Sequence, residues 1–420
     1  MAKMQHKETA KTWKRIEVGL VLQGGGALGA YEWGAVTGLL ELMDNVEAQG
    51  RAIDLIAVSG VSIGAINAAC IVGAKSRVNA CARLKSLWQD LALETPAYWS
   101  SMRLDLSSFG LPSIDPSRDL SLWGLPGFYV PRADVMQFAK WTSYYDTRPL
   151  IATLERHIDF DALNASGTKF SIAAVNIKTG KLTRFRNYAV TETEAKKDAI
   201  KARFASKAIP DNKHERITPS HIRASGSLPP QFPWTTIGAD HYWDGGIVDN
   251  APLSDVMDAF SPGEDVERLV VVMNLYPLHA QLPQNLHEVD DRVHELSYGN
   301  RVRQDHETAE RVNHLVATIQ QLAKLVPESD LTSELRDDIA KAALLKVVRV
   351  VEIDMQNPHP DPSQQQPFDD MEGLRDFSPR TIERRRALGR EIALGRLEPV
   401  LGHLPPTAQP AAAEAVASRS

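Results

Sequence analysis

The chain has few cysteines, no long apolar run and no excess of positive charge, and each shortage excludes a class of protein. Only two cysteines, Cys70 and Cys81, occur in 420 residues, and neither belongs to a Cys-x-x-Cys or Cys/His spacing. A disulfide scaffold is therefore excluded, and a reducing cytoplasm is expected. No apolar stretch reaches the roughly 18 residues of a membrane-spanning helix. The basic N-terminus is followed by no apolar segment of a signal peptide, so we expect a soluble chain.

The net charge and the spacing of the metal-binding residue types limit which partners, metal ions and cofactors are expected. The net charge is −6, whereas nucleic-acid-binding proteins normally present a basic field, so no nucleic-acid partner is expected. No His, Asp or Glu cluster has the spacing of metal ligands, and we predict neither a metal ion, calcium included, nor a cofactor. The apolar fraction of 43% and the charged fraction of 24% are typical of a globular protein with a sizeable core.

Two strand–glycine–helix units near the N-terminus predict a parallel sheet covered by helices. Ile16–Leu22 and Ile53–Val58 have the apolar character of buried strands, and each runs into glycines and then a helical pattern. The two helices are expected at about Leu28–Met43 and Ile63–Val72. Further strands are predicted at Phe170–Ile177 and Leu182–Arg186, joined as a hairpin, and at Leu269–Leu275.

The remainder of the chain divides into an insertion and a mainly helical C-terminal region. Residues 96–131 mix aromatic residues with proline and glycine, which is typical of a lid, a pocket wall or an irregular surface loop. We expect one domain over residues 16–275, a helical region over 276–403 and a disordered tail over 404–420. A strand is predicted at Val347–Ile353, a Pro/Gln/Asp loop at Pro358–Asp370 and an arginine-rich helix at Thr381–Leu397. An apolar stripe at helical spacing, expected to pack on the core, comprises Val312, Leu315, Ile319, Leu322 and Val326.

Gly60-Val61-Ser62-Ile63-Gly64 has the pattern of a nucleophile elbow. A Gly-x-Ser-x-Gly turn between a strand and a helix exposes the serine at a sharp bend, and the small flanking residues avoid collisions there. The helix that follows favours negative charge at its N-terminus. The alternative is a tight turn whose serine only caps the helix.

Gly24-Gly25-Gly26-Ala27-Leu28-Gly29 fits two kinds of site. The run satisfies the Gly-x-Gly-x-x-Gly pattern of a dinucleotide site, but no carboxylate ends the second strand, where that site requires one. An oxyanion hole explains the run better, because successive backbone N–H groups can point at one developing negative charge. A purely structural glycine turn is the third reading.

A third block completes a resemblance to a known family. Asp244-Gly245-Gly246 follows a short strand-like stretch, and Ala224-Ser225-Gly226-Ser227-Leu228-Pro229-Pro230-Gln231-Phe232-Pro233 precedes it. A lone Asp-Gly is usually a turn. Together with the glycine run and the serine elbow, and in this order, the blocks resemble the patatin-like phospholipase family over roughly residues 16–258, with a further C-terminal region as in some bacterial members.

The resemblance implies a fold, a reaction and a set of site residues. The fold is α/β, a three-layer arrangement with a mostly parallel sheet between helices and a mainly helical C-terminal extension. Ser62 would attack a lipid-type ester and Asp244 would take its proton in a Ser–Asp dyad, while the amides of Gly24, Gly25, Gly26 and Ile63 would hold the oxyanion. The glycines expected to support these turns are Gly29, Gly60, Gly64, Gly245 and Gly246.

Two residues depart from the family pattern, and one property of the base is predicted. Leu28 stands where a basic residue is usual, and Ser227 stands where a small apolar residue is commoner.

A solvated aspartate is a weak base, so we predict that Asp244 is buried, which raises its pKa toward that of a useful general base.

Three other functions fit parts of the sequence. An α/β-hydrolase would use a Ser–Asp–His triad with His279, His241 or His221. A thioesterase or transacylase would keep the elbow serine but use another substrate or acceptor. A binding protein would use the C-terminal helices, with the apolar stripe as the seam of a homo-oligomer or the arginines on an anionic lipid surface. For the hydrolase we expect a lipid or ester substrate, and transient contact with the inner face of the membrane is an option.

Overall fold

A computed structural model describes residues 15–93, 124–189, 211–261, 265–276, 282–283, 286–327, 348–355 and 374–402, with single positions between 331 and 339. Most of the insertion expected at 96–131, the loop expected at Pro358–Asp370 and the tail expected at 404–420 lie outside these residues.

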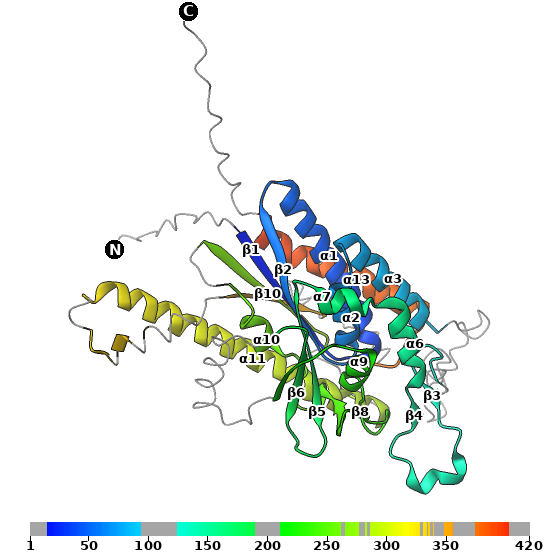
Figure 1. The fold of residues 1–420 in the computed structure, drawn as a ribbon. Coiled ribbons are helices and arrows are strands. Elements are labelled where there is room, and N and C mark those ends of the chain that lie inside the picture. Colours follow the sequence, from blue (N-terminus) through cyan, green and yellow to red (C-terminus); the bar gives the residue numbers. More distant parts are fainter. Residues whose placement is uncertain are drawn as a thin grey trace, which may run out of the picture.

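The core of the fold is a nine-stranded mixed sheet (Figure 1). Its main path runs β11-β10-β1-β2-β5-β6-β7, and β9 pairs with β5 and with β8. The pairs β11/β10, β10/β1, β1/β2, β2/β5 and β6/β7 are parallel, and β5/β6, β5/β9 and β8/β9 are antiparallel. The strand bounds are β1 Arg15–Leu22, β2 Ala52–Gly60, β5 Lys169–Asn176, β6 Leu182–Arg186, β7 Asp211–His214, β8 Thr235–Ile237, β9 Asp240–Asp244, β10 Val266–Asn274 and β11 Arg349–Asp354. A separate small pair joins β3 Val130–Pro131 and β4 Tyr145–Asp146.

The strand sequences are apolar on both sides, and the structure buries both faces of the sheet. In β1, Val18 and Leu20 face the larger hydrophobic cluster, whereas Val21 faces a second cluster with Val270 and Val272 of β10. Side chains alternate between faces along a strand, so a continuous apolar run requires cover on both sides. The parallel α/β sheet expected from the two N-terminal units is confirmed.

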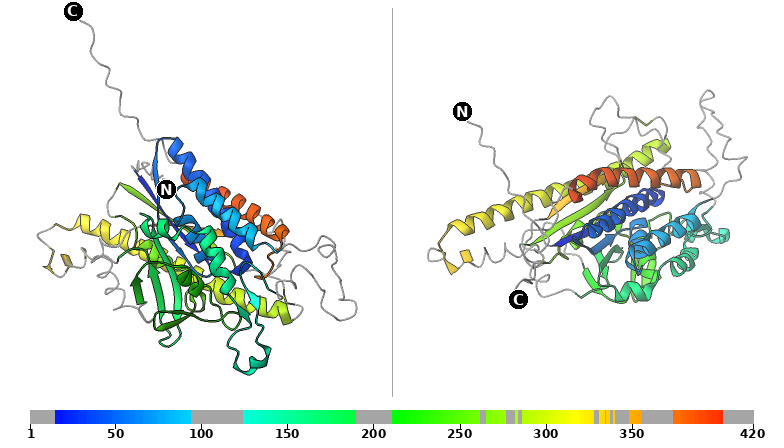
Figure 2. Two further views of the ribbon diagram at one scale, coloured as in Figure 1. Left: turned by 45° about the vertical axis from the view of Figure 1, so that its right-hand side comes forward. Right: turned by 90° about the horizontal axis from the view of Figure 1, so that it is seen from above.

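Helices provide that cover and complete three layers (Figure 2). The larger cluster packs under α1 (Gly29–Ala48), α2 (Ile63–Val72), α3 (Arg77–Leu91) and α13 (Pro379–Leu401), and the second under α10 (Leu253–Met257). The other helices are α6 (Arg148–His157), α7 (Phe160–Ala165), α9 (Pro219–Ser225) and α11 (Leu286–Leu325), with short 3-10 turns η1 (Gly26–Leu28), η4 (Val135–Lys140) and η5 (Gly245–Ile247). Within the described residues, no helix is both long enough and apolar enough to cross a bilayer.

Of the apolar stripe expected to pack on the core, the four residues whose burial is described do not do so. Leu315 is 60% exposed and Leu322 is 55% exposed, and Ile319 and Val326 are also on the surface. Leu315, Ile319 and Leu322 lie in the C-terminal half of α11, a 40-residue helix that extends past the sheet on one side of the body (Figure 1), and Val326 follows its last residue. The helical periodicity predicted the helix correctly, but periodicity alone does not specify what lies opposite an apolar face.

The arginine-rich helix expected at Thr381–Leu397 exists as α13, and it packs along α1 rather than standing free (Figure 2). Arg390 forms a bidentate ion pair with Glu41 of α1, and Arg386 lies over the Trp33 ring of α1 while also pairing with Glu383. Several of its arginines are therefore engaged within the protein instead of forming one free cationic face.

Candidate active site

Ser62 lies at a strained turn between a buried strand and a buried helix. β2 ends at Gly60, α2 begins at Ile63, and Ser62 has φ 55° and ψ −124°, the one non-glycine residue with positive φ in the described part of the chain. Such a conformation is unfavourable for a residue with a Cβ and persists only when the surroundings enforce it. Ser62 is partly exposed although Val61 and Ile63 are buried, so the bend presents the hydroxyl outward. This is the geometry of a nucleophile elbow.

The glycines of the elbow are required by close backbone approach. A Cβ on Gly64 would lie 2.7 Å from the Leu22 carbonyl oxygen, and one on Gly60 would overlap the Gly64 carbonyl. Real Cβ atoms do not approach backbone atoms so closely, so neither position accepts a side chain without moving the turn. The motif that identified the elbow is therefore the motif that the packing demands.

The backbone of Ser62 is held by a serine from another block. Ser62 N–H donates to Ser225 Oγ at 3.1 Å, and Ser225 Oγ–H donates to the Ala173 carbonyl of β5 at 2.7 Å. Ser225 is fully buried at the end of α9. The sequence identified this residue only as part of the block before the prolines; its contact with the elbow depends on folding that joins positions 163 residues apart.

Asp244 lies at the end of β9 and is buried, as expected from the sequence. Its side chain is 2% exposed, and its Oδ1 accepts a 2.8 Å hydrogen bond from Gly246 N–H. Burial raises the pKa of Asp244 to about 7, and hydrogen bonds from Gly246 N–H and from the Ser62 side chain oppose this rise. A carboxyl group with a pKa near neutrality can change its protonation state at physiological pH.

The structure brings Ser62 and Asp244 together, since the Ser62 side chain is near enough to the Asp244 carboxyl group to lower its pKa. Histidine does not take this place in the described residues. The His221 ring contacts Thr218 and Glu215, and the His241 ring contacts Thr236. His279 lies outside the described residues.

The glycine run supplies fewer candidate oxyanion donors than the sequence suggested. Gly24 N–H donates to Asn250 Oδ1 at 3.2 Å, so the expectation that this amide lines the hole is not met. Ala27 N–H donates to the Leu374 carbonyl at 2.9 Å. Within the described part of the chain, the amides of Gly25, Gly26 and Ile63 have no acceptor.

Asn250 and Tyr276 clamp the start of the glycine run. Asn250 Nδ2 donates to the Gly24 carbonyl at 3.1 Å, in addition to accepting from the Gly24 amide, and Tyr276 OH donates to the same carbonyl at 2.7 Å. All these groups are buried. Neither residue was identified from the sequence. Asn250 lies six residues after Asp244 in the same turn region, and this position is the one signal in the sequence that could have suggested Asn250.

The remaining expected glycines lie where segments meet. Gly29 begins α1 beside Ile63 and Trp88, Gly245 lies against the Ala173 backbone, and Gly246 provides the N–H that Asp244 accepts. The glycine turns and the elbow are thus gathered at the carboxyl ends of β1 and β2, with Asp244 at the adjacent end of β9.

Comparison with known protein families identifies the family of this chain. The model of the patatin-like phospholipases matches residues 20–257, more than half of the chain and the segment that contains Ser62 and Asp244. The chain belongs to the patatin-like phospholipase family. Family membership supports hydrolysis of lipid substrates in general terms, and a comparison with curated protein sequences found no match.

Solved structures with remote similarity include a cytosolic phospholipase A2 and two bacterial proteins. Human GIVD cytosolic phospholipase A2 is 13% identical, with a TM-score of 0.39, and the alignment covers 93% of this chain and 59% of that one. VipD from Legionella pneumophila is 12% identical with a TM-score of 0.34 and coverages of 92% and 67%. ExoU of Pseudomonas aeruginosa, in its complex with SpcU, is 13% identical with a TM-score of 0.32 and coverages of 93% and 53%. The chain thus spans between about half and two thirds of the length of these proteins.

One departure from the patatin-like pattern has a structural explanation. Leu28, where a basic residue is usual, is 7% exposed and belongs to the larger hydrophobic cluster. Its backbone N–H donates to the Gly25 carbonyl at 3.0 Å and closes the glycine turn. The side chain at this position therefore serves packing, and the charge of the usual residue has no counterpart at position 28.

The other departure, Ser227, is also accommodated. Its hydroxyl donates to the Arg223 carbonyl and bonds to Thr235, and its carbonyl accepts from Asp244 N–H at 3.0 Å. Ser227 is fully buried with its polar groups satisfied, so the hydroxyl can replace an apolar side chain without a desolvation penalty.

A buried acid beneath the site connects the patatin-like turns. Glu32 of α1 accepts from Gln23 N–H at 2.6 Å and from Asn67 Nδ2 at 3.0 Å, and Asn67 Oδ1 accepts from Trp88 Nε1. Burial raises the pKa of Glu32 to about 8, against the effect of these hydrogen bonds. The network ties the residue before Gly24 to the helix that follows Ser62.

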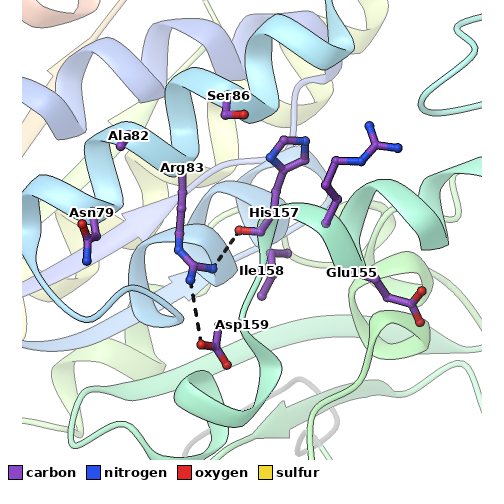
Figure 3. A pocket seen from close by; sticks show the side chains of 9 residues that line it. Asn79, Ala82, Arg83, Ser86, Glu155, His157, Ile158 and Asp159 are labelled. Atoms are coloured by element: carbon purple, nitrogen blue, oxygen red, sulfur yellow. Dashed lines mark hydrogen bonds and ion pairs between the residues drawn. The ribbon is translucent and has the colours of Figure 1, made fainter.

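A polar groove elsewhere on the molecule is not the reaction site. It has a volume of about 620 Å³, lies between α3 and α6, and contains neither Ser62 nor Asp244 (Figure 3). Within this groove, Arg83 donates to the His157 carbonyl and lies 3.9 Å from Asp159. Among the described residues, no three His, Cys, Asp or Glu side chains are grouped so as to hold a metal ion.

Proposed function

We propose that this protein is a serine acyl hydrolase that cleaves carboxylic esters of lipids with Ser62 as the nucleophile and Asp244 as the base. The observation that carries the proposal is the buried Asp244 carboxyl group, with the elbow residue Ser62 near enough to lower its pKa. A serine hydroxyl needs an adjacent base to become a useful nucleophile, and here a carboxylate is the adjacent group.

The reaction follows in two halves. Ser62 Oγ attacks the ester carbonyl and its proton passes to Asp244; the tetrahedral oxyanion receives hydrogen bonds from the Gly25, Gly26 and Ile63 amides. Collapse breaks the ester bond, and Asp244 returns the proton to the departing alcohol, leaving an acyl-serine. Asp244 then accepts a proton from water, which attacks the acyl group, and the fatty acid leaves as the Ser62 hydroxyl is restored.

The environment of each group supports its role. A pKa of about 7 for Asp244 allows the carboxyl group both to take and to return a proton near neutral pH. The amides of Gly25, Gly26 and Ile63 have no acceptor among the described residues, and Ile63 begins α2, whose N-terminus favours negative charge. Each donor of this kind typically contributes about 10²- to 10³-fold to the rate.

The substrate completes the proposal. We place the substrate among lipid esters because the family acts on lipids. We further propose that the reaction takes place in the cytoplasm, with transient contact with a membrane surface. Side-by-side product analysis with a glycerophospholipid, a neutral ester and an acyl thioester separates a phospholipase or esterase from a thioesterase or transacylase.

The experiment that tests the chemistry uses matched variants. Hydrolysis of this panel is measured for the wild type, Ser62→Ala and Asp244→Asn, with Ser86→Ala and Asp161→Asn as controls, since both control residues are exposed. We expect both site variants to lose at least about 10³-fold in kcat and the controls to match the wild type. Activity of Asp244→Asn within a few-fold of the wild type contradicts the proposal.

A further inference from the structure

The C-terminal helix is built onto the catalytic body although it lies beyond the residues that the family model matches. α13 runs along α1, and Gly389 lies so close to the Tyr31 carbonyl that a Cβ there has no room. Ile392, Ala393 and Leu397 of α13 join the larger hydrophobic cluster. The helices are therefore in direct backbone contact, and the segment that precedes α13 is held in place by this packing.

That preceding segment, residues 374–378, covers the glycine turn. The Leu374 carbonyl accepts the Ala27 N–H at 2.9 Å. Gly26 beneath it has φ +53°, and a Cβ at Gly26 would lie 2.5 Å from the same carbonyl oxygen. A left-handed glycine under a close backbone contact shows that the turn and the segment fit each other.

The segment has its own anchors. The Phe377 ring stacks on Trp88 at 6.2 Å between centroids, and the Phe377 carbonyl accepts from Leu93 N–H at 2.9 Å. Asp376 is buried and accepts from Ser378 N–H at 2.8 Å and from Thr381 Oγ1 at 2.9 Å. These bonds shape the turn that leads from the segment into α13.

Three successive peptide groups of the glycine turn are each fixed by a different partner. The Gly24–Gly25 peptide is held through its carbonyl by Asn250 and Tyr276, and the Gly25–Gly26 peptide through its carbonyl by Leu28 N–H. The Gly26–Ala27 peptide is held through its N–H by Leu374. In a trans peptide the N–H points opposite to the C=O, so holding the two carbonyls directs the Gly25 and Gly26 amides away from these partners.

We propose that residues 374–378 are a positioning element of the oxyanion hole, holding the glycine turn from above so that the Gly25 and Gly26 amides keep their direction. The inference rests on the proposed function, because it assigns a role to amides that the proposed reaction uses. It also gives the C-terminal region a task in catalysis. Preorganised donors are effective because they need no reorganisation as charge develops, and a loosened turn loses this advantage.

The test compares two glycines of the same helix. Gly389→Ala inserts a methyl group between α13 and the Tyr31 carbonyl, whereas Gly395→Ala places one in open space. For Gly389→Ala we expect a fall in kcat of about 10-fold or more with KM changed less than about 3-fold, since donors to the oxyanion act mainly in the transition state. Gly395→Ala is expected to match the wild type.

A second readout separates positioning from general damage. A trifluoromethyl ketone that forms an oxyanion with Ser62 should lose affinity for Gly389→Ala in proportion to the loss in kcat, while binding of the matching unreactive amide stays unchanged. The inference is overturned if Gly389→Ala loses affinity equally for both ligands. It is also overturned if Gly389→Ala keeps the wild-type kcat although its helices are displaced.

Variants of Asp376 decide the matter if Gly389→Ala does not fold. Asp376→Ala loosens the segment without touching the helix crossing and should show the same split between kcat and KM; Asp376→Asn keeps an acceptor for Ser378 N–H and should restore most of the activity. Full activity of a folded Asp376→Ala overturns the inference. Failure of the wild type to be labelled at Ser62 by a fluorophosphonate instead overturns the proposed function, so the two failures are distinguishable.

Discussion

At the scale of single residues, the proposed chemistry depends on one carboxyl group whose properties come from burial. Among the described residues, none contributes a positive charge to Asp244; the groups that act on its carboxyl group are the Gly246 amide and the Ser62 side chain. Burial without a counter-charge favours the neutral form of the carboxyl group, which gives a base strength that a solvated aspartate lacks. Two consequences of this environment can be measured.

The first consequence is a pH dependence of the reaction. Asp244 accepts a proton only when ionised, so kcat/KM should rise with pH and level off above an apparent pKa of about 7. Initial rates with a soluble ester from about pH 5 to about pH 9 measure this profile. A rise centred near the ordinary aspartate value of about 4 shows that the base is solvated and contradicts the account.

The second consequence concerns stability. The folded pKa of about 7 lies above the ordinary value of 3.8, so the stability that protonated Asp244 contributes is present below that ordinary value and is lost as pH rises through about 7. Asp244→Asn removes this penalty. We expect the variant to be inactive but more stable than the wild type, on the order of 2 kcal/mol near pH 8, with a smaller difference near pH 5.

Denaturant unfolding at these two pH values measures the difference. Asp161→Asn, at an exposed position, is the control and should show little change at either pH. A variant Asp244→Asn that is less stable than the wild type near pH 8 indicates that the charged carboxylate stabilises the fold, contrary to this account.

At the scale of elements, the site is an assembly of turns that hold one another. The turn after Asp244 reaches the glycine run through Asn250, the end of β10 reaches it through Tyr276, and α9 reaches the elbow through Ser225. The contacts of Asn250 and Tyr276 are buried and that of Ser225 is partly buried, so loss of one partner leaves a polar group without full compensation.

Asn250 provides the test at this scale. Asn250→Ala removes the bonds to the Gly24 N–H and to the Gly24 carbonyl. We expect kcat to fall by about 10²-fold with a small change in KM, because the Gly25 amide loses its direction. Tyr276→Phe removes one bond to the same carbonyl and should show a smaller loss. Asn79→Ala, at an exposed position on α3, is the control. Equal activity of Asn250→Ala and the control contradicts the clamp.

Local elements were predictable from the sequence because their signals are local. The apolar runs and glycine turns predicted β1, β2, α2 and the β5/β6 hairpin with bounds close to those observed. The α11 stripe shows the limit of such signals: its periodicity predicted the helix, but Leu315 and Leu322 are exposed. A repeating apolar pattern identifies a face and does not identify its partner.

At the scale of the whole molecule, the site depends on contacts that join distant parts of the chain. Ser62 and Asp244 were found because each belongs to a motif with an order along the sequence. Asn250, Tyr276 and Leu374 belong to no such motif, and they contact residues of the glycine run that lie 226 residues or more away in the sequence. Only the topology of the sheet, with β10 beside β1, brings Tyr276 to that run.

The same topology explains why the C-terminal region is part of the body. β11 adds to the sheet beside β10, and α13 covers α1 on one face. The Tyr31 hydroxyl of α1 donates to the Asp354 carbonyl at the end of β11. The composition of the C-terminal region predicted helices and a strand, but composition could not indicate that they complete the layers around the site.

The most direct measurement is the rate at which a fluorophosphonate modifies Ser62, followed by mass spectrometry in the wild type and in Asp244→Asn. If Asp244 activates the hydroxyl, the wild-type rate rises with pH through about 7, and Asp244→Asn reacts at least about 10³-fold more slowly with no dependence on pH in that range. Modification of Ser62 in Asp244→Asn at the wild-type rate would show that another group is the base and contradict the central claim.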